Sequence, residues 1–114
     1  LEFYYDTVGY YPTSIAPLVV SSGTGGSLAS EPKDPQSTQS YKYAYKLLSG
    51  STSKATAYEI GANIEQATTP LLAGDRDMDA ATAATFSNTT GFVGTDTAGC
   101  GSETGLYCYD VSNL

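Results

Sequence analysis

A regular alternation of tyrosines constrains the fold more than any other feature of this chain. Tyr41, Tyr43 and Tyr45 occupy every second position, which places three rings on one face of an extended strand. The following segment 50–53 reads GSTS and has the composition of a hairpin connection. Residues 56–61 then alternate again. The sequence therefore predicts a β-hairpin with one tyrosine face.

The two strands have a preferred register. With Ser49 opposite Lys54, the predicted partners are Tyr43–Ile60, Ala44–Glu59 and Tyr45–Tyr58. Cross-strand aromatic pairs each stabilise a sheet by roughly 0.2–1 kcal/mol. We expect Glu59 on a solvated face, diagonally between Lys42 and Lys46, because this pattern is typical of an antiparallel sheet covered on one side only. Another part of the chain must then cover the tyrosine face.

Length and charge exclude several classes of function. The 114 residues correspond to one domain, and five basic against twelve acidic residues give a net charge of −7. A surface that binds nucleic acid or an anionic membrane needs clustered Lys and Arg, so neither partner is expected. The chain has no histidine, which removes the commonest general base for a Ser or Cys nucleophile. We therefore expect a protein that is not an enzyme.

The two cysteines, Cys100 and Cys108, predict a short-range disulfide. They do not form a CxxC motif, and no histidine is available to complete a zinc site. Closing so small a loop stabilises the fold by roughly 2–3 kcal/mol in the chain-entropy model. A disulfide implies an oxidising compartment such as the periplasm, the cell surface or the medium. The alternative is a pair of reduced cysteines in a cytosolic domain.

The first residues have the spacing of a helix. Leu1, Tyr4, Tyr5 and Val8 fall at i, i+3, i+4 and i+7, and Gly9 suits the left-handed position that ends a helix. Nothing before Leu1 caps this helix. We therefore expect it to continue a longer helix in a membrane-anchored or helix-led protein.

Two shorter elements complete the expected fold. After Pro12, which stops the first helix, the spacing of Ile15, Leu18 and Val19 predicts a short second helix, with Thr13 or Ser14 as its cap. Near the end of the chain, residues 105–112 alternate again, with Cys108 and Asp110 on the same face. This pattern predicts a last strand beside the hairpin.

The order of these parts resembles the soluble domain of a bacterial type IV pilin or of a major pseudopilin of type II secretion. The residues that carry the resemblance are Gly9, Tyr11, Pro12, Leu18, Pro32-Lys33-Asp34-Pro35, Tyr41, Tyr43, Tyr45 and Tyr58-Glu59-Ile60-Gly61-Ala62, followed by Cys100 and Cys108. Type II major pseudopilins usually carry a Trp-Gly-x-Pro pattern after the turn, where this chain has Gln36-Ser37-Thr38-Gln39. They also generally lack the disulfide, so a type IV pilin-like subunit is favoured.

The resemblance implies an α+β fold of the pilin-like type, in which an N-terminal helix stub packs across a small antiparallel sheet and the C-terminal region is closed by the disulfide. It divides residues 1–114, as a single globular domain, into four parts. These are the end of the long helix (1–9), the αβ-loop (13–40), the β-hairpin (41–65) and the C-terminal loop region with the last strand (66–114).

The resemblance also implies a structural function. Such subunits polymerise with identical or related subunits into a filament outside the cell, and before assembly a hydrophobic helix anchors them in the inner membrane. The expected filament-packing face is Leu1, Tyr4, Tyr5 and Val8. The alternative is a minor tip pilin or a secretion pseudopilin that acts as an adhesion or binding module and depends on calcium.

One acidic run is a candidate metal site. The alternating carboxylates are Asp75, Asp77 and Asp79. Carboxylates on a bending loop can converge on calcium, which takes six to eight oxygen ligands, and calcium in the C-terminal loops is a feature of type II pseudopilins. The run is not an EF-hand, because the turn Gly and the bidentate Glu are missing. Asp96 and Glu103 are further candidate ligands that the sequence does not place. The alternative is a solvated acidic loop in which Arg76 offsets one charge.

Overall fold

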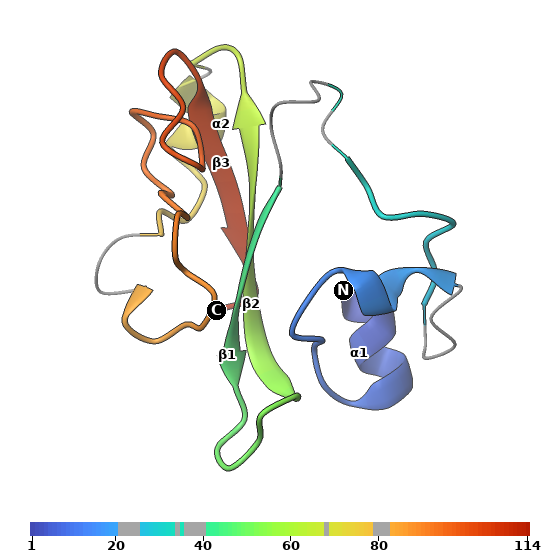
Figure 1. The fold of residues 1–114 in the computed structure, drawn as a ribbon. Helices are drawn as coiled ribbons and strands as arrows, with labels where there is room; N and C mark the ends of the chain where they lie inside the picture. Colours follow the sequence, from blue (N-terminus) through green and yellow to red (C-terminus); the bar gives the residue numbers. More distant parts are fainter. Residues whose placement is uncertain (21–25, 34, 36–40, 68, 79–82) are drawn as a thin grey trace.

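The computed structural model describes residues 1–20, 26–33, 35, 41–67, 69–78 and 83–114. Its elements are α1 (Glu2–Val8), the 3-10 turn η1 (Ala16–Leu18), β1 (Lys42–Leu47), β2 (Ala55–Ile64), α2 (Thr69–Leu72) and β3 (Tyr107–Ser112). The strands form one antiparallel sheet in the order β1-β2-β3 (Figure 1). The predicted α+β class is confirmed. Asp34 of the predicted turn and residues 36–40 lie outside the described residues.

The predicted hairpin register is confirmed along most of its length. The pairs Tyr43–Ile60, Ala44–Glu59 and Tyr45–Tyr58 all form. The register shifts after Lys46, so that the expected pairing of Ser49 with Lys54 is wrong by one residue: the amide of Leu48 donates to the carbonyl of Lys54 at 2.9 Å. Contacts within the turn favour the shifted register. The Ser51 hydroxyl oxygen accepts hydrogen bonds from the amides of Ser53 and Lys54.

Helix α1 and the segment after it cover the tyrosine face, as Figure 1 shows on one side of the sheet. Gly9 ends the helix with a φ of 80°, as predicted. The Glu2 carboxylate accepts hydrogen bonds from Tyr11 at 2.9 Å and from Tyr58 at 3.1 Å. The Tyr43 hydroxyl donates to the Pro12 carbonyl at 2.7 Å. Long tyrosine side chains therefore join the helix to the sheet.

The opposite face of the sheet is also covered, so the expected one-sided sheet is wrong. Glu59 and Ala44 are both 0% exposed, and Glu59 does not lie on a solvated face. The segment that follows β2 packs here, and its core side chains include Met78, Phe86 and Phe92. Alternation alone shows that one face is more polar. It does not show whether a distant loop returns to cover that face.

Loops cover part of each outer edge of the sheet, where unpaired main-chain groups can recruit another strand. On the β1 edge, Tyr45 exchanges two main-chain hydrogen bonds with Ser87, at 3.2 and 2.7 Å. On the β3 edge, the Asp110 carbonyl accepts from the Arg76 amide at 3.3 Å, and the Asp110 amide donates to the Asp75 carboxylate at 3.2 Å. The loop that follows α2 therefore covers the outer edge of β3.

Three other expectations have clear outcomes. The predicted second helix is only the single turn η1, which begins after Ile15 without a side-chain cap from Thr13 or Ser14. The last strand begins at Tyr107, because Gly105 has a φ of 80° and lies in a turn. The disulfide between Cys100 and Cys108 is confirmed, with a Cα–Cα distance of 4.6 Å. In the described parts of the chain, no helix has the length and hydropathy needed to cross a bilayer.

Replacement of Gly61 by alanine tests the packing on the sheet face that carries Ala44 and Glu59. A Cβ at this position of β2 would lie 2.8 Å from the Phe92 ring and 2.9 Å from the Cys100 sulfur. We expect Gly61→Ala to lower the free energy of unfolding in urea by about 1–3 kcal/mol, the usual effect of overpacking. Gly74→Ala is the matched control, because its nearest neighbour would be 3.5 Å away. Equal stability of the two variants would contradict the close packing.

Candidate metal centre

Three carboxylates from two parts of the chain meet at the β3 edge. Asp75 and Asp77 come from the loop after α2, and Asp110 comes from β3. One oxygen of each lies within 4.8 Å of the others. Two of the three predicted ligands are therefore brought together, while Asp79 lies outside the described residues. Sequence reasoning missed Asp110 as a ligand.

The loop wraps closely around Asp110. In addition to the two main-chain contacts at the sheet edge, the Met78 amide donates to Oδ2 of Asp110 at 3.1 Å. Gly94 also lies against this contact, because a Cβ added there would overlap both Oδ2 of Asp110 and Met78. Only glycine fits this position without displacing the aspartate. The Asp110 side chain is thus held between two loops and is 0% exposed.

Burial and neighbouring charges strongly disfavour ionisation of this aspartate. Burial, then the carboxylates of Glu59, Asp75 and Asp77, raise the pKa of Asp110 to about 8. Burial also raises the pKa of Asp75, and the charges of Asp96 and Asp77 add to this effect. Asp96, which the sequence left unplaced, therefore lies close enough to act on Asp75. A bound cation would relieve the mutual repulsion of these groups.

The nearby arginine does not neutralise the three aspartates. The Arg76 Nε lies 3.8 Å from a carboxylate oxygen of Glu59, and its Nη1 donates to the Leu114 carbonyl at 3.1 Å. The alternative of a solvated acidic loop stays open for Asp77, which is exposed, and for the half-buried Asp75, whereas Asp110 is buried. The other unplaced acid, Glu103, accepts a hydrogen bond from the Gly101 amide at 2.7 Å.

The residues present fit a hard divalent cation. The Oδ1 atoms of Asp75, Asp96 and Asp110 are buried and have no hydrogen-bond donor among the described residues. Calcium binds oxygen at 2.3–2.6 Å, so two ligands of one ion lie at most about 5 Å apart, and the observed cluster meets this limit. An all-oxygen set suits calcium better than zinc. Asp75, Asp77 and Asp110 would hold the ion, which would supply charge neutralisation and no chemistry of its own.

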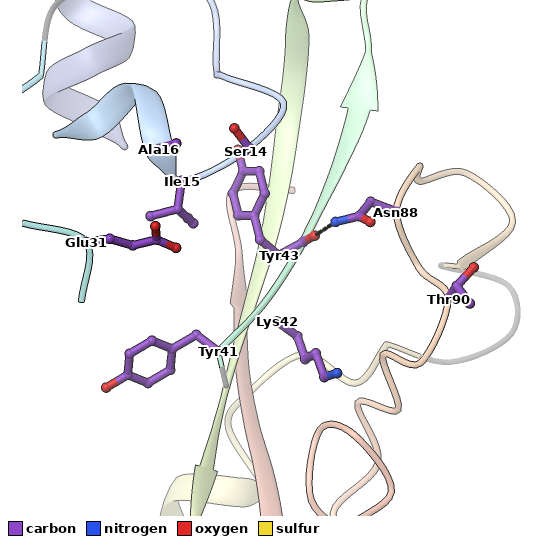
Figure 2. Close-up of a pocket in the computed structure, with 9 residues that line it drawn as sticks. All are labelled: Ser14, Ile15, Ala16, Glu31, Tyr41, Lys42, Tyr43, Asn88 and Thr90. Carbon is purple, nitrogen blue, oxygen red and sulfur yellow. Dashed lines mark hydrogen bonds between the residues drawn. The ribbon is translucent and has the colours of Figure 1, made fainter. Parts of the chain in front are cut away.

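A surface groove lies elsewhere on the molecule. It has a volume of about 360 Å³ and is lined by residues 14–16, Glu31, residues 41–43, Asn88 and Thr90. Figure 2 shows that the side chains approach it from both sides of β1. Its volume lies at the lower end of the range for ligand sites.

The four residues expected to form a filament-packing face lie in different environments. Tyr4 is 4% exposed and faces the interior of the domain. Leu1 and Val8 are half-buried. Tyr5 is 40% exposed and its ring lies 4.6 Å from that of Tyr11. The most exposed large apolar side chain of α1 is Phe3, at 62%.

We compared the chain with protein-family models, with curated proteins and with solved structures, and none of the three comparisons gave a match.

The pKa of Asp110 makes a prediction for protein that has been freed of metal at neutral pH and transferred to metal-free buffers. The folded state keeps a proton up to about pH 8, whereas the unfolded state loses it near the ordinary value of 3.8. Between these values the folded state binds more protons, so the free energy of unfolding falls as pH rises. The contribution of Asp110 to the free energy of unfolding is fully present only below about pH 4. Urea denaturation from pH 4 to 8 measures this slope.

Two variants identify the source of the slope. Asp110→Asn cannot ionise at this position, so we expect a flatter dependence of stability on pH. Asp6→Asn is the control, since Asp6 is an exposed residue of α1. An unchanged slope in Asp110→Asn would contradict the assignment.

Proposed function

We propose that this chain is the globular domain of a pilus-like filament subunit, of the type IV pilin kind, which assembles outside the cell with identical or related subunits. The observation that carries the proposal is the arrangement of α1 across the tyrosine face of the sheet (Figure 1). The resemblance in sequence implies this arrangement, with a longer N-terminal helix that anchors the subunit in the inner membrane before assembly.

The exposed side of α1 supports the proposal. Its inner side is bonded to the sheet through Glu2 and Tyr58 and buries Tyr4, and it leaves the Phe3 side chain in solvent. Contiguous exposed apolar patches mark contacts with other proteins, and Phe3 adds to the exposed apolar surface of α1 together with the partly exposed Tyr5. Neighbouring subunits in a filament are partners that would bury Phe3.

The metal centre has a structural role in this proposal. A calcium ion bound by Asp75, Asp77 and Asp110 would fix the loop after α2 to the edge of β3. The same loop includes Met78, a core residue. The ion would therefore stabilise the cover of the second sheet face and keep the β3 edge closed.

A second candidate function is a binding module, such as a minor pilin at the filament tip or a secretion pseudopilin. The groove beside β1 favours it, because it combines the Tyr41 ring with Glu31 and Lys42. The distribution of the protein along filaments separates this function from the main proposal.

Immunogold labelling tests the filament proposal. Antibodies raised against the exposed hairpin loop, residues 48–54, should label filaments from cells that produce the full-length protein. Regular labelling along the length is the expected result for a main subunit. Labelling at the tips alone would favour the binding module. Protein on cells without filament labelling would contradict both, and cells that lack the gene are the control.

Calorimetric titration tests the metal centre. The purified domain should bind calcium, and Asp77→Asn should weaken the affinity by about 10-fold or more, because one charged ligand is lost. Asp77 is exposed, so this variant should still fold. Asp6→Asn, an exposed aspartate distant in sequence from the site, should bind like the wild type. Equal calcium affinity of both variants would contradict the proposed ligand set.

A further inference from the structure

The edge of β1 is only partly covered. The main-chain groups of Tyr41, Tyr43 and Tyr45 point away from β2, because the residues between them make the ladder with it. Tyr45 is bonded to Ser87, and the Tyr43 carbonyl accepts from the Asn88 side chain at 2.6 Å. Within the described parts of the chain, no hydrogen bond reaches the Tyr43 amide or the Tyr41 carbonyl. The edge is open at these two groups.

The groove of about 360 Å³ lies at this open part of the edge. In Figure 2, Ile15, Glu31 and the Tyr41 ring lie on one side of β1, while the Lys42 side chain points to the other side, where Asn88 and Thr90 also lie. The floor therefore offers one main-chain donor and one acceptor. One wall combines Ile15 and the Tyr41 ring with the Glu31 carboxylate, and the other carries the Lys42 ammonium.

We propose that this groove binds an extended peptide segment of a partner protein, which adds a short strand to the edge of β1. The segment has an acidic residue between two apolar residues. This mode of recognition uses the main chain for affinity and alternate side-chain positions for specificity.

The geometry of an antiparallel ladder sets the register. A peptide residue opposite Lys42 would be flanked by one carbonyl that accepts from the Tyr43 amide and one amide that donates to the Tyr41 carbonyl. The side chain of the central residue would lie on the same face as Lys42, which favours Asp or Glu. Its two neighbours would point to the other face, toward Ile15 and Tyr41, which favours apolar side chains.

The walls favour a single strand over a second copy of the sheet. The groove lies between the segment 14–16 and the loop at Asn88 and Thr90. Asn88 has a φ of 63°, in the left-handed region, and its side chain is bonded to β1. A whole sheet approaching edge to edge would meet these walls, whereas an extended segment passes between them.

Titration of the isotopically labelled protein with the acetylated and amidated peptide Thr-Val-Glu-Val-Thr tests the proposal by NMR. We expect the largest shift changes at the amides of Tyr43 and its neighbours in the groove, with weak affinity typical of a two-bond contact. A peptide of the same sequence, N-methylated at the residue that should donate to the Tyr41 carbonyl, should lose binding. No shift changes up to about 5 mM peptide, or equal binding of the N-methylated peptide, would overturn the proposal.

A charge variant provides a second measurement. Lys42→Gln should weaken binding of the acidic peptide by about 2- to 5-fold, the range for exposed ion pairs. Lys46→Gln is the matched control, because Lys46 is on the same strand and exposed but does not line the groove. Equal weakening by both variants would show non-specific attraction and would overturn the assigned register. The result is independent of whether the protein forms filaments.

Discussion

Asp110 is the residue on which the C-terminal half of this structure depends. Its amide, its carbonyl and its carboxylate each form a hydrogen bond with the loop of residues 75–78. One residue of β3 therefore attaches this loop to the edge of the sheet. This arrangement has an electrostatic cost, because a fully buried carboxylate lies beside Glu59 and two further aspartates. Buried charges are normally paired or bound to a metal. A proton on Asp110, which the folded state keeps up to about pH 8, or a bound cation would relieve this cost.

The sheet accepts layers on both faces because the two faces carry side chains of different size. One face presents tyrosines, whose hydroxyl groups reach the Pro12 carbonyl and the Glu2 carboxylate. The other presents Ala44 and Gly61 next to Glu59, and these small residues leave room for the Phe92 ring and the disulfide. The long side chains allow a helix to pack at a distance, while the small ones allow an irregular segment to pack closely.

The sequence predicts those features that depend on neighbours along the chain. The hairpin register between Lys42 and Lys46 followed from the assumed turn, although the pairing next to the turn was wrong by one residue. The end of α1 followed from Gly9, and the disulfide from the number and spacing of the cysteines. The burial of Glu59 did not follow, since it depends on a segment that returns from far along the chain. The cluster of carboxylates was predicted only in part, because only the loop aspartates form a local pattern. One signal for Asp110 was present: a charged residue on the same strand face as a disulfide cysteine, a face that must be buried.

The disulfide and the acidic cluster attach the segment between β2 and β3 to the sheet at two points. Cys108 and Asp110 lie on the same face of β3, and each contacts a different part of the segment: Cys108 the loop at Cys100, and Asp110 the loop of residues 75–78. Gly94, between these two points in the sequence, lies against Asp110. The two attachments differ in chemistry. The disulfide depends on oxidising conditions, whereas the contacts of Asp110 depend on the protonation of a buried carboxylate that lies beside other acids.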